Sequence, residues 1–484
     1  MTFKDFAKGA MVIGAAQIMV GVGNFLVLPV VTRLLGTYNY GVWVTILVTT
    51  TLLSHLAILG LSTAILRFLP SKTDRKELSE QFFTMLAFVT ALGIGLALVL
   101  VAASGTVATE LFNDSDLTPA VAIAFFMIPL SAINALTTAY FRAVDKVKTF
   151  VLMSVLGAYG QLFLILAFSG FGIFGVVTAA LSSMLLVSVV SLSIIAHQIG
   201  VSRPRLAILM PNLKFGLPLT PNSVISWLMD SSDRYLVAGI LGLGAAGIYS
   251  AGWGIGSVVF QLVIPIQMIL YPTMSRMYDE GRLDDVRSYL SRSMRYFLML
   301  TIPAVAGLTI LAEPLLVSLT SPDFASGAVV IPFIALSSMF AGANALIMTI
   351  LLLVQKTHLN LVIYVLPAVL NVVLVIVMTP FLGIMGTAIA STTAMAILLA
   401  LGIWISFRYI RFSFDRAFAL KSIASSAMMG AAIMIISPGN LFEIVLSVGV
   451  GAVIYFTALL LMRGVAREEL DFAKGIVHRV MDRQ

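Results

Sequence analysis

The sequence contains no cysteine and few charges, and both absences exclude classes of chemistry. Without a thiol, the 484-residue chain can form no disulfide and no thiolate-based site. Only 11% of its residues are charged, and only four are histidine. No His, Asp or Glu cluster has the spacing of a metal site, and no Ser-His-Asp set can be proposed. A Walker A lysine loop is also missing, which excludes ATP hydrolysis by that route. The sequence therefore predicts a protein that is not an enzyme and carries no metal or cofactor.

Long apolar runs dominate the chain instead. Hydrophobic residues make up 60% of it, and the mean hydropathy is +1.05, far from that of a soluble domain. Because roughly 20 apolar residues cross a bilayer as a helix, we expect an all-α polytopic membrane protein. Its fourteen spans are predicted at about 9–34, 41–66, 81–103, 118–141, 149–169, 172–196, 213–240, 246–272, 293–318, 327–354, 358–381, 384–407, 419–438 and 441–462. The first run is too long for a cleaved signal peptide, so we expect it to be retained.

The chain is a tandem duplication. Three residues of the first half return 206 positions later: Lys8, Gly36 and Gly41 recur as Lys214, Gly242 and Gly247. The displacement then drifts to 210 and 211, as Asn134-Ala135-Leu136 returns at 344–346 and Gly172-Ile173-Phe174-Gly175 at 383–386. Six spans per repeat is an even number, so both halves begin on the same side of the membrane and are related by an axis along its normal.

This repeat predicts the domain organisation. Residues 1–210 and 211–408 are expected to form two six-helix lobes that face each other across a central cavity. Residues 409–484 lie outside the repeat and are expected to add two transmembrane helices and a cytoplasmic tail. The loops are short, the longest being about 273–291, so no soluble catalytic domain is expected. Within that loop, an amphipathic helix on the inner surface and a solvated connector both remain open.

The basic residues predict the orientation. With the N-terminus in the cytoplasm, all but two of the 29 Lys and Arg residues fall in cytoplasmic segments. The outer loops then carry only acids: Glu110, Asp114, Asp116, Glu313, Asp323 and Glu443. The net charge of +7 therefore reports orientation and contact with anionic lipids rather than with nucleic acid. We expect a multi-pass protein of the cell membrane with both termini in the cytoplasm.

The two remaining basic residues, Arg33 and Arg234, fall in the equivalent first spans of the two halves. Counted back from Gly242, Arg234 lies about 12 Å and Asp230 about 18 Å below the outer end. An ionisable group at that depth should face a water-filled cavity or a partner rather than lipid. The expected substrate-binding residues are Arg33, Arg234, Asn24 and Asn222. The expected ion-coupling residues are Asp230, Asp233 and His55.

Each of these residues also has a structural interpretation. Arg33, near a helix end, could extend to the outer interface. Asp230 and Arg234 could form an intrahelical pair that binds no ligand. His55 could be a neutral imidazole packed between helices rather than a proton carrier, and the asparagines could be interhelical hydrogen-bond partners.

Three short motifs resemble a known family. They are Leu34-Leu35-Gly36-Thr37-Tyr38-Asn39-Tyr40-Gly41, then Asp233-Arg234, and then Ile240-Leu241-Gly242 followed by Gly247-Ile248-Tyr249-Ser250-Ala251. Together with the fourteen spans, they are similar to the polysaccharide flippases (Wzx-like) of the multidrug/oligosaccharidyl-lipid/polysaccharide exporter superfamily. The resemblance implies movement of a polyprenyl-pyrophosphate-linked oligosaccharide from the inner to the outer leaflet by a rocking-bundle cycle. That cycle would be driven by an ion gradient or the membrane potential, with Arg33, Asp233 and Arg234 at the cavity.

The expected partners are the lipid-linked oligosaccharide, membrane lipids and the polysaccharide assembly machinery. Two rival transport functions remain. A multidrug/cation antiporter would use Asp230 and Asp233 to exchange a cationic drug for H⁺ or Na⁺, although the two arginines would repel its substrate. A lipid II flippase would share the fold and differ in its substrate.

Overall fold

The computed structural model describes residues 3–72, 74–356 and 358–464, and the side chains discussed below are those from Met19 onward, His358 excepted. The side chains of Lys4 and Lys8 and the basic residues after Gly464 lie outside this description. Every regular element of the described residues is a helix, as the apolar runs predict. The prediction of an all-α membrane protein is therefore confirmed.

Eleven helical stretches of the described residues are long and apolar enough to cross a membrane. Two of them bend sharply at a glycine: α1 (Phe3–Ile58) at Gly36 and α17 (His358–Ser406) at Gly383. A further helix, α10 (Thr220–Leu241), has 22 residues but carries three ionisable side chains, which lower its hydropathy. Counting each bent helix as two and adding α10 gives an arrangement compatible with fourteen spans, and that number stays a prediction.

Equivalent glycines of the two repeats share an unusual backbone conformation. Gly36 has φ 67° and ψ −176°, and Gly242, 206 positions later, has φ 89° and ψ 169°. Gly172 and Gly383, 211 positions apart, have φ 56°, ψ −136° and φ 61°, ψ −147°. Only glycine adopts such angles without strain. The duplication in the sequence is thus also a duplication of the turns between consecutive spans.

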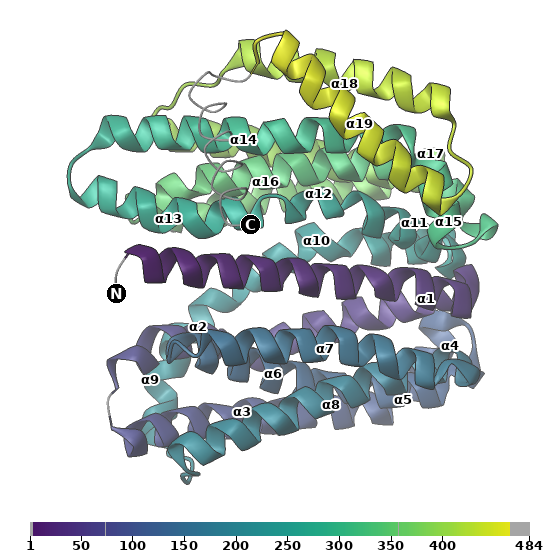
Figure 1. The fold of residues 1–484 in the computed structure, drawn as a ribbon. Coiled ribbons are helices and arrows are strands. Elements are labelled where there is room, and N and C mark those ends of the chain that lie inside the picture. Colours follow the sequence, from purple (N-terminus) through teal and green to yellow (C-terminus); the bar gives the residue numbers. More distant parts are fainter. Residues whose placement is uncertain (1–2, 73, 357, 465–484) are drawn as a thin grey trace, which may run out of the picture. The chain divides into compact units, whose positions relative to one another are not determined.

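One contact unit comprises residues up to Gly254 together with 320–327 and 361–394. In it, α1 packs against α7 and α10, and α6 packs against α3 and α8 (Figure 1). Besides α1, α10 and part of α17, its helices are α2 (Leu61–Phe68), α3 (Arg75–Ala102), α4 (Ser104–Phe112), α5 (Thr118–Phe125), α6 (Met127–Ala143), α7 (Val147–Ala167), α8 (Gly172–Ile199), α9 (Leu206–Gly216) and most of α11 (Leu243–Gly256). Short 3-10 turns join them: η1 (Leu69–Ser71), η2 (Ser115–Leu117), η3 (Ser169–Phe171) and η4 (Leu217–Leu219).

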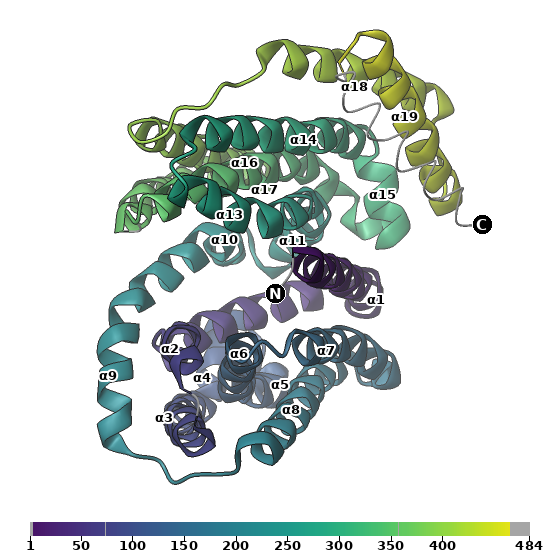
Figure 2. The ribbon, with the colours of Figure 1, turned by 60° about the vertical axis from the view of Figure 1, so that its left-hand side comes forward.

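The second contact unit comprises residues 255–319, 328–360 and those from Met395 onward. There, α14 packs against α16 and α18, and α18 packs against α19 (Figure 2). Besides the rest of α17, its helices are α12 (Val258–Gln261), α13 (Ile264–Asp279), α14 (Leu283–Ile310), α15 (Ala312–Leu319), α16 (Ile331–Leu353), α18 (Arg416–Ile436) and α19 (Leu441–Leu461). The 3-10 segment η5 (Pro322–Val330) precedes α16. The boundaries predicted at 210 and 408 follow the repeat rather than these contacts, and they stay a prediction.

The expected long loop at 273–291 is wrong. Helix α13 continues to Asp279, and α14 begins at Leu283 and runs without interruption into its membrane span. Asp284 and Asp285 lie in the first turn of α14, where negative charge favours the helix N-terminus. Charged residues at these positions therefore extend the helices instead of forming a connector.

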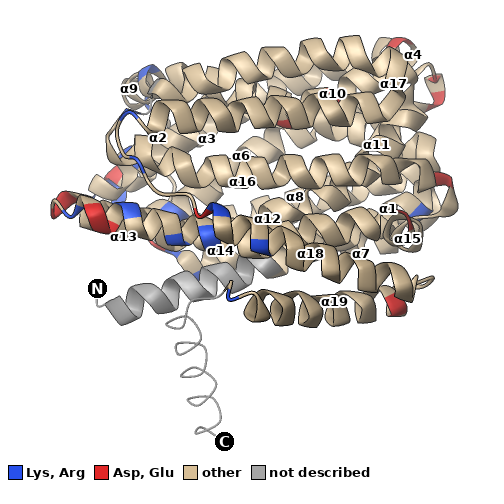
Figure 3. Ribbon diagram, turned by 90° about the horizontal axis from the view of Figure 1, so that it is seen from above, with Lys and Arg blue, Asp and Glu red and all other residues tan. Residues whose placement is uncertain are grey.

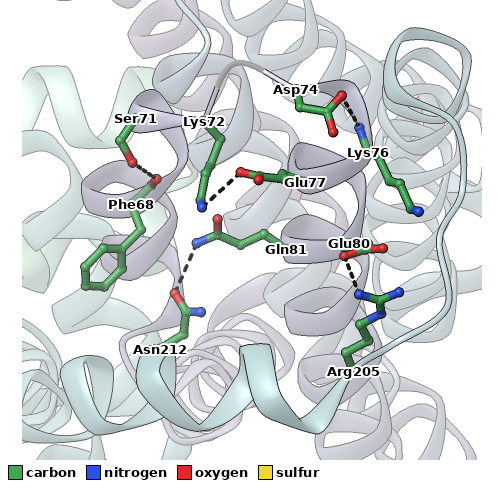
Figure 4. A network of polar contacts seen from close by, with 10 residues as sticks. All are labelled: Phe68, Ser71, Lys72, Asp74, Lys76, Glu77, Glu80, Gln81, Arg205 and Asn212. Atoms are coloured by element: carbon green, nitrogen blue, oxygen red, sulfur yellow. Dashed lines mark hydrogen bonds and ion pairs between the residues drawn. The ribbon is translucent and has the colours of Figure 1, made fainter.

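A polar network holds the connector between the two repeats (Figure 4). Arg205, just before α9, forms a 3.0 Å ion pair with Glu80 of α3. The next residue of α3, Gln81, donates to Asn212 of α9 at 3.4 Å, with both side chains about 5% exposed. Gly60 and Gly216 bring the backbones of the α1–α2 turn and α9 so close that a Cβ on either would overlap the other segment. The connector is therefore fixed to the N-terminal ends of α2 and α3.

Lys and Arg gather at one end of the helices in each unit, together with some acids, whereas the opposite end carries mainly acids (Figure 3). In the first unit, Lys and Arg lie around η1, the start of α3 and α9, whereas Glu110, Asp114 and Asp116 lie at the opposite helix ends, around α4 and η2. In the second unit, five arginines between 276 and 295 lie at the α13–α14 turn, whereas Glu313 and Glu443 begin α15 and α19. This is the asymmetry on which the predicted orientation depends.

Candidate functional site

The predicted ionisable cluster lies on α10, in the first contact unit. Pro218 in η4 and Pro221 in the first turn of α10 precede it, positions that tolerate a missing backbone N–H. Gly242 ends the helix with a positive φ. Asp230, Asp233 and Arg234 therefore occupy one turn of a regular helix, and their surroundings decide what each can do.

Asp233 is buried, and both of its carboxylate oxygens accept hydrogen bonds. Oδ2 accepts from the Tyr249 hydroxyl at 2.5 Å, and Oδ1 accepts from the backbone N–H of Arg234 at 2.8 Å. The Asp233 side chain is 2% exposed, and Tyr249, on α11, is fully buried. A buried carboxylate is costly unless it is hydrogen-bonded. Asp233 is thus anchored inside the protein, with no oxygen facing a pathway.

Arg234 is held on one side only. Its Nη1 donates to the Asp230 carbonyl oxygen at 3.1 Å and to Ser231 Oγ at 3.3 Å. Its Cζ lies 3.9 Å from the centroid of the Trp253 ring, a cation–π distance. Among the described residues, none of the ion pairs within 4.0 Å includes Arg234. The predicted side-chain pair of Asp230 with Arg234 is therefore replaced by a bond to the Asp230 backbone.

The opposite edge of the Arg234 guanidinium, formed by Nε and Nη2, has no protein acceptor among the described residues. Neither atom belongs to the fully buried unsatisfied polar atoms of that part of the chain. Two parallel N–H groups on one guanidinium edge match the spacing of two oxygens of a phosphate or carboxylate. The edge therefore has the geometry that binding an anion requires.

The remaining predicted residues of these helices lie at different levels. Asp230 is exposed, in contrast to Asp233. Asn222 is exposed as well, about 12 Å nearer the start of α10 than Asp230. Asn24, on the first half of α1, is also exposed, and nine residues separate it from Arg33, which places the two on opposite faces of a regular helix. Asn24 and Arg33 therefore do not share one surface of α1.

Arg33 and His55 lie on the two arms of α1. Arg33 Nε donates to the Thr320 carbonyl oxygen at 2.9 Å, at the bend of α1 near Gly36. Thr49 and Tyr235, joined by a hydrogen bond between their hydroxyls, link the second half of α1 to α10. His55 lies half-buried about 9 Å beyond Thr49 along α1. The structure thus brings Asp230, Asp233 and Arg234 together on one turn of α10. Asn222 lies earlier on the same helix, and Asn24, Arg33 and His55 lie on α1.

Two residues of the site were missed in the sequence analysis. Tyr249 and Trp253 are four residues apart on α11, so they lie on one face of that helix. They contact Asp233 and Arg234 respectively. The signal was an aromatic pair with i, i+4 spacing in the span directly after the charged helix. No group of three or more His, Asp or Glu in the described part of the chain could hold a metal ion.

Sequence comparisons relate the chain to proteins of surface-polymer synthesis. A model of the family described as polysaccharide biosynthesis protein matches residues 30–328. The chain is 24% identical over 317 residues to lipopolysaccharide biosynthesis protein WzxC of Escherichia coli (strain K12), covering 62% of this chain and 60% of that protein. It is 25% identical over 257 residues to the probable flippase AglR of Haloferax volcanii, covering 51% of this chain and 52% of that protein. These matches span less than two thirds of each relative.

Solved structures share the fold over a greater length. The lipid II flippase MurJ in an inward closed conformation superposes with a TM-score of 0.72, covering 95% of this chain and 98% of MurJ at 16% identity. An inward-facing multidrug resistance transporter of the MATE family has a TM-score of 0.67, covering 82% of this chain and 97% of that one at 16% identity. These relatives are flippases and transporters rather than enzymes, in agreement with the missing catalytic signatures.

Proposed function

The chain belongs to the family of polysaccharide biosynthesis proteins, and from this we propose that it is a flippase for a lipid-linked oligosaccharide. Its substrate would be a saccharide attached through pyrophosphate to a polyprenyl lipid. The protein would move it from the cytoplasmic to the outer leaflet of the cell membrane. One observation supports this substrate class. Arg234 lies within a membrane-spanning unit, and its Nε and Nη2 have no protein acceptor among the described residues.

A pyrophosphate linkage provides hydrogen-bond acceptors for the Nε and Nη2 groups of Arg234. Its oxygens are charged acceptors, and a guanidinium binds two of them at once. The stack on Trp253 and the bonds of Nη1 orient Arg234 before a ligand arrives, which reduces the entropy lost on binding. Exposed asparagines such as Asn24 and Asn222 would contact sugar hydroxyls, and these contacts need little specificity for one sugar.

Transport against a gradient needs an energy source, and the carboxylates of α10 are candidates for coupling to H⁺ or another cation. Asp230 is exposed and so can exchange a cation with water. Asp233 would first have to break its bond to Tyr249. We therefore assign the coupling role to Asp230 and the role of a buried counter-charge for Arg234 to Asp233. Both termini would be cytoplasmic, with the acidic helix ends outside.

Mass spectrometry of lipid extracts from source cells with and without the gene tests this function. Accumulation of a polyprenyl-linked oligosaccharide on loss of the gene supports the proposal and identifies the sugar. Accumulation of lipid II instead would assign the chain to that substrate. Unchanged lipids together with greater sensitivity to cationic drugs would replace the flippase by a cation antiporter.

A further inference from the structure

Helix α11 and the second half of α1 touch through two glycines. A Cβ added to Gly41 would overlap the backbone carbonyl of Leu243 and lie 3.1 Å from the nitrogen of Gly247. A Cβ added to Gly247 would overlap the carbonyl of Thr37 and lie 2.9 Å from the nitrogen of Gly41. Backbone therefore meets backbone here, with no room for a side chain on either helix.

The contact is reciprocal and follows the repeat. Gly247 lies 206 positions after Gly41, and Leu243 lies 206 positions after Thr37. Gly41 thus contacts the equivalent of Thr37, and Gly247 contacts Thr37 itself. Such an exchange of partners is the signature of a contact on a two-fold axis. The local axis that relates the two repeats passes between Gly41 and Gly247.

Further contacts lie beside this crossing. Tyr40 packs edge-on against Phe324, with ring centroids 6.0 Å apart, and Phe324 is fully buried. Arg33 donates to the Thr320 carbonyl oxygen at 2.9 Å. The segment 320–327, from the second half of the sequence, is therefore bound to the bend of α1 next to the glycines. All of these residues belong to the first contact unit.

We propose that Thr37, Gly41, Leu243 and Gly247 form a glycine clasp that closes the outer end of the pathway and separates whenever that end opens. Two backbones that touch cannot be loosened by the rotation of a side chain. The two helices are therefore either in van der Waals contact at the clasp or separated. Small residues at such crossings also permit weak Cα–H···O=C bonds, which form and break without desolvating a charge. The clasp stabilises the closed outer end and contributes nothing once the end is open.

The inference rests on one part of the proposed function, the change between closed and open outer ends, and the distance measurement below tests it independently of the cargo. Gly41→Ala and Gly247→Ala add a methyl group that only the open form can accommodate. Because of the two-fold relation, both substitutions should act in the same direction and to a similar extent. Gly244→Ala is the matched control. Gly244 lies on α11 three residues before Gly247, its φ is not positive, and no atom lies within 4 Å of a Cβ added to it.

Electron–electron distance measurements between nitroxide labels test the clasp. The chain has no cysteine, so Leu34→Cys and Ile240→Cys, two exposed and repeat-equivalent positions beside the clasp, accept one label each. In detergent-solubilised, monodisperse protein, Gly41→Ala and Gly247→Ala should raise the ratio of long to short distances by at least about tenfold. Gly244→Ala should leave the distribution unchanged. Wild-type distributions in both clasp variants would overturn the proposal.

A second experiment keeps both glycines and so remains decisive if the alanine variants fail to fold. The Leu34→Cys/Ile240→Cys chain is treated in cells with a short, reducible bis-methanethiosulfonate that ties the two outer ends together. Surface polysaccharide should stop appearing and should return after reduction, whereas either single-cysteine chain should be unaffected. Continued export by the cross-linked chain would refute the clasp. The lipid analysis described above separately tests whether the cargo is a lipid-linked oligosaccharide.

Discussion

At the scale of single residues, the proposed site depends on one arginine that is fixed on one side and, in the part of the chain that the structure describes, has no protein acceptor on the other. Lysine at position 234 would keep the charge, but it would lose the flat stack on Trp253 and the two-pronged edge. Hydrogen bonds to charged groups contribute about 1.5–3 kcal/mol each. We therefore expect Arg234→Lys to lower transport about 10- to 100-fold, measured as the amount of lipid-linked oligosaccharide that accumulates in cells.

The control for Arg234→Lys is another arginine-to-lysine substitution at a position outside the proposed site. Arg411, exposed and bonded through Nε to the Phe407 carbonyl, lies outside the membrane spans. Arg411→Lys should leave the lipid pool as in the wild type. Equal amounts of both variants in isolated membranes show that folding is not the cause. Full transport by Arg234→Lys would mean that a point charge suffices and that the edge does not bind pyrophosphate.

Tyr249 should matter for stability more than a hydroxyl that faces water would, because its hydrogen bond to Asp233 is buried. Removing its hydroxyl in Tyr249→Phe leaves Asp233 Oδ2 buried without a partner, which costs about 1–3 kcal/mol. Asp230→Asn should cost less than about 0.5 kcal/mol, because that side chain is exposed. Thermal unfolding in detergent measures both. Adding Asp233→Asn to Tyr249→Phe should recover part of the loss, and an unaltered midpoint in Tyr249→Phe alone would contradict the anchoring of Asp233.

The sequence could predict that a charged cluster lies on α10, but it could not predict which carboxylate is buried and which is exposed. Depth in the membrane and helical spacing identified Asp230, Asp233 and Arg234 as one group. Asp233 and Asp230 differ only in what lies opposite them, and Tyr249 and Trp253 come from the next helix. No rule of spacing within α10 contains that information. For the same reason, the segment that Arg33 binds, 287 positions away, could not be foreseen.

At the scale of elements, the glycine turns are where the chain tolerates change least. Gly36 adopts φ 67° and ψ −176°, a region that costs other residues about 1–3 kcal/mol. Gly36→Ala should therefore lower the thermal unfolding midpoint, and Gly242→Ala should do the same because its turn is alike. Gly239→Ala, in regular helix with nothing within 4 Å of the added Cβ, should raise stability by up to about 1 kcal/mol. Similar midpoints for Gly36→Ala and Gly239→Ala would refute the role of the turn.

Apolar runs predicted where helices cross the membrane better than where they end. The spans predicted at 9–34 and 41–66 are compatible with the two arms of α1, whose bend at Gly36 was marked by the repeat. The second of them continues past the end of α1 at Ile58 into α2. Helices α13 and α14, in contrast, extend through charged sequence to Asp279 and from Leu283. Beyond the hydrocarbon region, hydropathy carries no signal, and first-turn acids such as Asp284 and Asp285 favour a helix as readily as a loop. The short outer helices α4 and α15 were missed for this reason.

At the scale of the whole molecule, direction of transport depends on which helix ends face the cytoplasm. Basic residues around η1, α9 and the α13–α14 turn, with acids at the opposite ends, favour a cytoplasmic location for the former. Cysteines placed one at a time in the cysteine-free chain can test this in each contact unit separately. Ser115 and Ser437 are exposed near the acidic ends, and Ser71 and Ser413 are exposed near the basic ends.

In intact cells, a membrane-impermeant maleimide should label Ser115→Cys and Ser437→Cys. Ser71→Cys and Ser413→Cys should react only after the membrane is opened with detergent, because the bilayer then no longer separates them from the reagent. Each substitution replaces one oxygen by sulfur at an exposed site, so folding should be preserved. The inverse pattern would place the basic ends outside and would remove the inner-to-outer direction from the proposed function. It would also move the glycine clasp to the cytoplasmic end, where it would close the entrance instead of the exit.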